Sequence, residues 1–299
     1  MIKRYNFVLI FFFFSLVSAQ ENKNKISTSI NGYVSYLPSL INTEESTDLS
    51  HLFHNRINLK GYYNEKFSFG LGIRNRIFSG KNSNINPDLG VTDLSFFLIN
   101  NNDFKIHSII DRLWFKYSLE NIELSIGRQR VNWGINQIWN SNDLFNAYNF
   151  MDFDYIERPG SDVFRVQYFG DNLSTLDIVY KPKSFNESIL AGLYKINKLG
   201  YDIQFLLAKY NDELVFGGGW AGNIKNAGFK GEVSLFYPNK ESLIKKNSTS
   251  FSSSIDYSFT NGLYVLFTYL YNSNGFVNSK NLNLFSISES RLSPKNLMP

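Results

Sequence analysis

The sequence predicts an all-β protein, and within that class a transmembrane antiparallel up-and-down β-barrel. Three observations predict this fold: an N-terminal export signal, long segments that alternate between apolar and polar residues, and connections that alternate between short and long. The 299 residues include 28 Phe and 18 Tyr, which favour strands, and no Cys. The missing cysteines exclude a disulfide scaffold and a thiolate metal site.

Residues 1–19 have the parts of a secretory signal peptide. Lys3 and Arg4 are basic, residues 7–17 form an almost unbroken apolar run, and Val17, Ser18 and Ala19 are small enough for a signal peptidase. The apolar run is too short to cross ~30 Å of hydrocarbon as a helix. We therefore expect cleavage before Gln20 and a barrel over residues 20–299. No later apolar stretch is long enough for a helical membrane span.

Alternation with a period of two marks the predicted strands. Phe53 and Ile57 share one face of the first clear segment, whereas His54 and Arg56 share the other. Most segments approach the ~9–11 tilted residues that cross a bilayer. The predicted strands cover residues 27–37, 51–63, 66–77, 110–119, 122–132, 162–169, 173–181, 188–196, 200–210, 213–222, 227–237, 248–259 and 261–271, with a partial strand near 282–288.

The connections between these segments are alternately short and long, as in outer-membrane barrels with periplasmic turns and external loops. The short ones are residues 64–65, 120–121, 170–172, 197–199, 223–226 and 260. The long ones are residues 38–50, 78–109, 133–161, 182–187, 238–247 and 272–281, and residues 211–212 are an exception. A soluble β-sandwich also alternates, with its apolar side inward, and the period alone does not distinguish the two folds.

In a barrel, the polar residues of each strand line the lumen. Among these polar-face residues, the basic ones come mostly from the first half of the chain, and the acidic ones, Glu232 among them, mostly from the second. Either the basic wall makes the channel prefer anions, or the charges pair across the lumen and only keep it wet. The predicted lining residues are Arg56, Lys60, Arg74, Arg76, Arg112, Lys116, Glu123, Arg165, Asp177, Asp202 and Asp256.

The connection over residues 133–161 is long enough to fold back into the lumen as a constriction, or to pack over the barrel mouth. Asn142 or Asp143 is placed to cap a short helical turn within it. Ion pairs are expected to hold the loop. They would join Arg128, Arg130, Arg158 and Arg165 to Asp143, Asp152, Asp154 and Glu157.

Three motifs in this region carry a family resemblance: G-R-Q-R-V-N-W-G at 127–134, W-N-S-N-D-L-F-N at 139–146 and R-P-G-S-D at 158–162. The stretch resembles porin-like outer-membrane barrels of Gram-negative bacteria, near the phosphate-selective and alginate-export porins. The resemblance implies a passive diffusion channel of roughly sixteen or more strands. A lysine-rich phosphate-trapping loop is not evident, so phosphate selectivity is not expected. The constriction and motif positions are Arg128, Gln129, Arg130, Trp133, Gly134, Trp139, Asp143, Asn146, Arg158, Pro159 and Asp162.

No constellation of an enzyme or a metal site is recognisable. His51, His54 and His107 lack metal-ligand spacing, and no serine lies in a G-x-S-x-G elbow. We expect no cofactor, and as partners the outer-membrane lipid, small hydrophilic solutes and the barrel-assembly machinery, but not nucleic acid. An alternative function is a non-conducting barrel that acts as an adhesin or scaffold through its external loops.

The predicted strand count suggests that the barrel is incomplete. Bacterial single-chain barrels have even strand numbers, whereas thirteen strands and a fragment are predicted here. The chain ends in Leu297, Met298 and Pro299 rather than in an aromatic residue. We therefore expect several C-terminal closing strands to be missing.

Overall fold

The computed structural model describes residues 4–6, 12–17, 26–42, 47–80, 90–146, 157–184, 187–239 and 247–273. Every regular element in these ranges is a β-strand. None of the described residues belongs to a helix with the length and hydropathy of a membrane span. The predicted strand near 282–288 lies outside the described ranges, as do Asp152 and Asp154.

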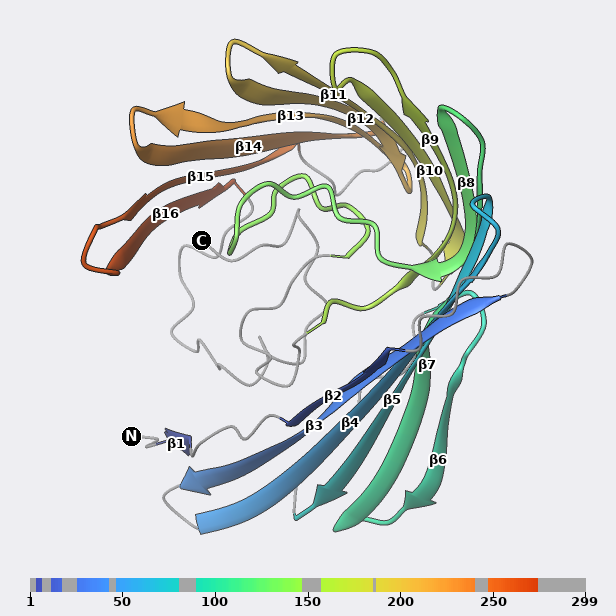
Figure 1. Cartoon of the computed structure of the whole chain (residues 1–299). Coiled ribbons are helices and arrows are strands. Elements are labelled where there is room, and N and C mark those ends of the chain that lie inside the picture. The colour runs from blue at the N-terminus through green and yellow to red at the C-terminus, as the bar shows by residue number, and fades with distance from the viewer. Residues whose placement is uncertain are drawn as a thin grey trace. The chain divides into compact units, whose positions relative to one another are not determined.

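The strands form one antiparallel up-and-down sheet, which confirms the predicted all-β class (Figure 1). Its order is β1-β3-β4-β5-β7-β8-β9-β10-β11-β12-β13-β14-β15-β16, with β2 paired to β3 and β6 to β7. Among the described strands, this order ends at β1 and β16 without a pairing that closes it. The bounds are β1 (Arg4–Asn6), β2 (Phe12–Val17), β3 (Ser27–Asn42), β4 (Thr47–Tyr63), β5 (Phe67–Ser79), β6 (Ser95–Asn100), β7 (Phe104–Ser118), β8 (Ile122–Gln129), β9 (Ser161–Phe169), β10 (Thr175–Ser184), β11 (Glu187–Lys198), β12 (Tyr201–Tyr210), β13 (Glu213–Ile224), β14 (Ala227–Pro238), β15 (Ser248–Ser258) and β16 (Tyr264–Asn272).

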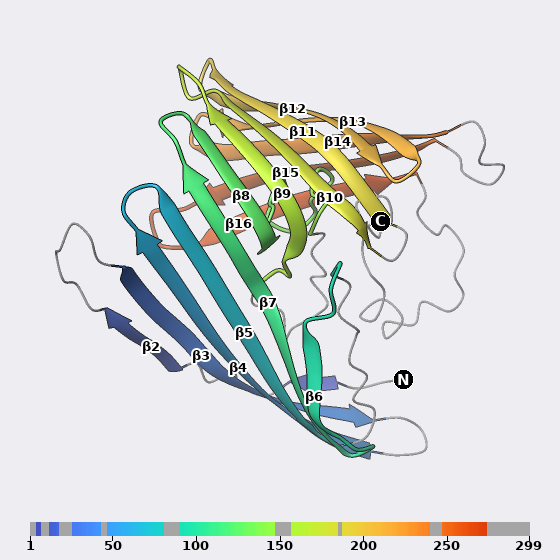
Figure 2. The same cartoon turned by 90° about the vertical axis from the view of Figure 1, so that its right-hand side faces the viewer.

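The chain divides into two compact units. The first comprises Met1–Ser118 with Ile126–Gln129, and the second comprises Leu119–Ser125 with Arg130–Pro299. Strands β1–β7 belong to the first unit and β9–β16 to the second. In Figure 2 the colours run from blue to green along the first unit and from green to red along the second.

The strands of the first unit are longer than the alternation predicts. β3 and β4 pair as far as Asn42 with Thr47, so the predicted connection 38–50 shrinks to residues 43–46. The predicted loop 78–109 contains β6 and the start of β7. These segments keep their backbone pairing where their side chains no longer alternate, which is why the pattern missed them.

The predicted alternation of connection lengths holds only in part. β10 and β11 continue their ladder past a bulge to the pair Ser184 and Glu187, so only residues 185–186 separate the two strands. The prediction of a longer connection over 182–187 is therefore wrong. Long connections remain before β9 and between β14 and β15.

Strands β1 and β2 lie within the predicted signal peptide. β2 pairs with β3 from Phe12 opposite Val34 to Val17 opposite Ser29, and β1 pairs with a later part of β3. These pairings describe the chain with its N-terminal segment attached. Cleavage before Gln20 stays a prediction.

Large apolar side chains are exposed on one face of the sheet, whereas polar side chains are buried on the other. In β4, Phe53 and Ile57 are each 46% exposed, but His54 and Arg56 are only 1% exposed. In β12, Phe205 is 55% exposed and its neighbour Gln204 is buried. A soluble β-sandwich buries its apolar faces against each other. The observed distribution is the reverse.

A bulge in β7 supplies the counter-ion of a buried arginine. Gly72 of β5 pairs with Arg112 while the next residue, Ile73, pairs with Ile110, so Asp111 is an extra residue. Its carboxylate accepts two hydrogen bonds from the Arg56 guanidinium, at 2.5 and 2.9 Å. Residues 105, 107 and 109 face the polar side before the bulge, and residues 112, 114 and 116 face it afterwards. The bulge therefore changes which residues face which side.

Glycines lie opposite large aromatic rings on neighbouring strands. Gly70 pairs with Trp114 in the first unit, and Gly231 pairs with Trp220 in the second. A Cβ atom on either glycine would overlap the opposite indole ring. The missing side chain gives each ring the room to lie across its neighbour strand.

Candidate functional site

The segment that follows β8 lies against the sheet of the second unit. Figure 1 shows this segment, residues 130–146, inside the curve of strands β9–β16. Trp133 donates its indole N–H to Asp177 Oδ2 of β10 at 2.8 Å, and Gln204 Nε2 of β12 donates to the Trp133 carbonyl at 3.2 Å. Asp177 and Gln204 are strand residues, so the segment contacts the strands themselves and not only the loops at their ends. We call residues 130–146 the docked loop, and the face it covers the loop side.

An apolar cluster forms where the docked loop meets the strands. Trp133 and Phe145 pack edge to face, with ring centroids 5.0 Å apart. Both rings are buried together with strand residues such as Val163, Leu193 and Leu206. The loop side therefore combines a small apolar core with polar contacts. The full cluster comprises Val131, Trp133, Leu144, Phe145, Val163, Val179, Ile189, Ala191, Leu193, Leu206, Ala208, Tyr210, Val215 and Phe236.

Glu232, in the middle of β14, binds three main-chain N–H groups of the docked loop. Its Oε1 accepts from the N–H groups of Ile135 and Asn136, both at 2.6 Å. Its Oε2 accepts from the N–H of Asn142 at 2.9 Å. Glu232 is 0% exposed, so its carboxylate is shielded from solvent.

Serines of β15 extend this contact to the next strand. Asn136 donates from Nδ2 to Ser252 Oγ at 2.9 Å and accepts at Oδ1 from Ser254 Oγ at 2.6 Å. The hydroxyls of Ser141 and Ser250 are 2.9 Å apart. Small hydroxyl side chains let the loop approach the sheet while they satisfy its polar groups.

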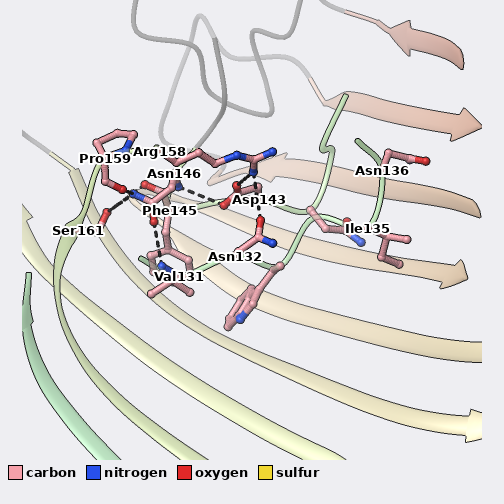
Figure 3. A network of polar contacts seen from close by, with 12 residues as sticks. Val131, Asn132, Ile135, Asn136, Asp143, Phe145, Asn146, Arg158, Pro159 and Ser161 are labelled. Carbon is pink, nitrogen blue, oxygen red and sulfur yellow. Dashed lines mark hydrogen bonds and ion pairs between the residues drawn. The ribbon is translucent and has the colours of Figure 1, made fainter. Parts of the chain in front are cut away.

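The predicted motif residues Asp143 and Arg158 form an ion pair at the far end of the loop (Figure 3). Arg158 Nη1 donates to Asp143 Oδ2 at 2.7 Å and to Asn132 Oδ1 at 3.1 Å. Burial raises the pKa of Asp143, and the Arg158 charge opposes this shift. The other carboxylate oxygen accepts the Asn146 N–H at 3.1 Å, as a cap does, but the described residues 144–146 that follow it are not helical. Within these residues the predicted helical turn does not form.

Asn146 ties the two ends of the long connection together. Its Oδ1 accepts the Val131 N–H at 3.1 Å, and its Nδ2 donates to the Pro159 carbonyl at 2.6 Å. Ser161, the first residue of β9, donates its hydroxyl to the Phe145 carbonyl at 3.0 Å. Figure 3 shows these contacts side by side. The motifs W-N-S-N-D-L-F-N and R-P-G-S-D are thus brought together by hydrogen bonds.

The remaining predicted motif residues are Gln129, Arg130, Gly134, Trp139 and Asp162. A Cβ atom on Gly134 would overlap the Asn140 side chain, and Trp139 accepts the Ser252 hydroxyl at its carbonyl, at 2.9 Å. Gln129 is buried, Asp162 is half-buried, and Arg130 is exposed.

Arg128 and Arg165 were both expected to form ion pairs that hold the loop, and their contacts differ. Arg165 forms a pair with Asp177 at 2.7 Å, and this carboxylate also accepts the Trp133 indole. Arg128 donates to the carbonyls of Ile110 and Thr92, at 3.0 and 2.8 Å, within the first unit. Arg128 therefore contacts the backbone around β6 and β7, and its expected role in holding the loop stays a prediction.

The predicted lining charges of the first unit lie on its buried polar face. Arg74 is opposite Arg56 on the neighbouring strand, and Arg76 contacts His107 Nδ1 at 3.2 Å. Arg112 donates to the Asp111 carbonyl at 2.7 Å. At the other end of these strands, Lys60 is exposed and Lys116 lies 5.8 Å from the centre of the Trp114 ring.

In the second unit, Asp256 pairs with Lys230 of the adjacent strand at 3.4 Å, and Asp202 accepts from Asn197 at 2.6 Å. Glu123 of β8 is half-buried. The pairs Arg56 with Asp111 and Arg165 with Asp177 likewise join residues of one unit. Neither the pairing of charges across a lumen nor a field between opposite walls is tested by these contacts.

Within the described ranges, no group of three or more His, Cys, Asp or Glu side chains is arranged to hold a metal ion. No protein-family model matches the chain, and no curated protein matches its sequence. The resemblance to porin-like barrels therefore stays a prediction.

Proposed function

We propose that this protein is a porin-like channel of the bacterial outer membrane. Its apolar face contacts lipid, and its polar face encloses water through which small hydrophilic solutes diffuse. The observation that carries the proposal is the exposure of large apolar side chains opposite a buried polar face. In a transmembrane barrel the outward residues are apolar and the inward residues are polar, because lipid lies outside and water inside.

The exposed apolar residues are contiguous across strands, which strengthens the proposal. Tyr180 is paired with Phe164 on one side and with Leu190 on the other, and all three are exposed. Soluble monomers rarely expose contiguous apolar patches above a few hundred Å². A lipid environment would remove this surface from water. The proposal includes export by a cleaved leader and insertion by the barrel-assembly machinery.

The docked loop would narrow the channel, because it covers the loop side in the middle of the strands. The arginine-rich face of the first unit supports a preference for anions. A second candidate function is a non-conducting barrel that acts as an adhesin or scaffold. The apolar cluster around Trp133 and Phe145 favours it, because such packing fills space that water would otherwise occupy.

Reconstitution of the exported chain, with any further strands that its gene encodes, tests both proposals. We expect insertion into liposomes, swelling in isotonic sugar, and discrete conductance steps in planar bilayers. Reversal potentials in a salt gradient then test the anion preference, which cation selectivity would contradict. A protein that inserts but passes neither sugar nor ions supports the second function. A compact monomer that stays dispersed without detergent refutes both membrane proposals.

A further inference from the structure

The hydrogen bonds between Glu232 and the docked loop are suited to anchor the loop, that is, to hold it in one position on the sheet. An isolated buried carboxylate is costly, and so are main-chain N–H groups without acceptors. The loop has no regular secondary structure that would satisfy its own N–H groups. Three of them, from Ile135, Asn136 and Asn142, point at one carboxylate within 2.9 Å. Each partner thus removes the cost of burying the other.

The chemistry of this contact requires an ionised carboxylate. A carboxylate only accepts hydrogen bonds, and both oxygens of Glu232 are used here. A glutamine of nearly the same shape keeps one acceptor, but its NH₂ group would face at least one main-chain N–H. Hydrogen bonds to charged groups are also stronger than those between neutral groups, such as the ones made by Ser250 and Ser252.

We infer that Glu232 is the positioning residue that fixes the docked loop against the sheet and thereby determines the width of the channel. The fixation follows from the contacts of Glu232, whereas the effect on channel width depends on the proposed function. The serines of β15 add hydrogen bonds to the loop, and Glu232 holds it in place.

An engineered disulfide reports the loop position without any measurement of transport. The chain has no cysteine, so Ser141→Cys with Ser250→Cys introduces the only thiols. Their hydroxyls are 2.9 Å apart, which places the two sulfur atoms for oxidation to a disulfide. The folded protein in detergent is oxidised, and cross-link formation is followed with time. The same pair is then measured with Glu232→Gln, and with Glu120→Gln as the same chemical change at an exposed turn.

We expect fast cross-linking in the parent and in the Glu120→Gln background. With Glu232→Gln the equilibrium constant for docking should fall by about tenfold or more, because one charge-assisted hydrogen bond corresponds to at least this factor, and the cross-linking rate should fall with the docked fraction. Heat-modifiable migration on gels shows that each variant is folded. Equal rates in the Glu232→Gln and Glu120→Gln backgrounds would overturn the inference.

Conductance of the cysteine-free proteins then tests the consequence for the channel. We expect Glu232→Gln to give a larger and noisier single-channel conductance than the parent. Slower cross-linking with unchanged conductance would refute the role in channel width but leave the anchor intact. A parent that does not conduct at all refutes the proposed function, and the cross-linking result still decides whether Glu232 fixes the loop.

Discussion

Replacement of Phe205 by arginine tests which medium surrounds the exposed apolar face. Phe205 lies in the middle of β12, is 55% exposed, and is paired with Tyr194 and Gly218. Leu199, in the turn before this strand, is 91% exposed. Both side chains are accessible, so substitution by arginine disturbs little internal packing at either position.

The expected magnitude follows from the depth of each residue. Six residues at ~3.3 Å each, on a strand tilted by ~40°, place Phe205 roughly 15 Å deeper than Leu199, near the middle of a ~25 Å apolar band. An arginine there costs about 2–4 kcal/mol, and one near the interface costs about 0–1 kcal/mol. In water, an exposed substitution would change stability by only about 0.5 kcal/mol.

The assay is reversible unfolding of the protein in phospholipid vesicles by guanidinium, followed by tryptophan fluorescence. Phe205→Arg should lower the free energy of unfolding by about 2–4 kcal/mol, and Leu199→Arg by no more than about 1 kcal/mol. Phe205→Leu should remain close to the parent, because it stays apolar. If the two arginine variants are equally stable, Phe205 does not face lipid and the proposed orientation of the sheet is wrong.

Three further substitutions probe individual contacts by the same unfolding measurement. Asp111→Ala should cost about 3–5 kcal/mol because it removes the carboxylate that accepts two hydrogen bonds from the buried Arg56 guanidinium. The apolar double replacement Arg56→Met with Asp111→Leu should regain most of this loss; equal losses would contradict this. Gly70→Ala should cost about 1–3 kcal/mol through overlap with the indole opposite, while Gly192→Ala, which has nothing within 4 Å of its Cβ, should be neutral. Because burial raises the pKa of Asp143, its stabilising contribution is complete below about pH 4 and declines as the pH rises through the raised value. Asp143→Asn should remove this decline, and parallel pH profiles of the two proteins would show that the carboxyl is not perturbed.

Side-chain alternation predicted the strands well wherever one face is uniformly apolar. β12 and β13 begin within one residue of their predicted starts. β6 was missed because Phe96 and Phe97 are adjacent and both exposed, so no period of two exists. The period also could not reveal which face is exposed, because a sandwich and a barrel share it. The structure shows that many large apolar side chains are on the exposed face.

The candidate site was predictable only where its partners are close in the chain. Asp143, Asn146 and Arg158 lie within one connection, and their network joins the motifs singled out in the sequence. The partners of Glu232 precede it by 90 to 97 positions, so no spacing in the sequence relates them. Only the order of the strands brings them together.

The bulge in β7 makes this strand one residue longer than its pairing with β5 requires. If residue 111 were deleted, Ile110 and Arg112 would become neighbours and would match Ile73 and Gly72 in an uninterrupted ladder. The shorter strand would be geometrically simpler, yet Arg56 would lose the Asp111 carboxylate that accepts two of its hydrogen bonds. A redesign that regularised this strand would therefore also have to provide for the buried arginine.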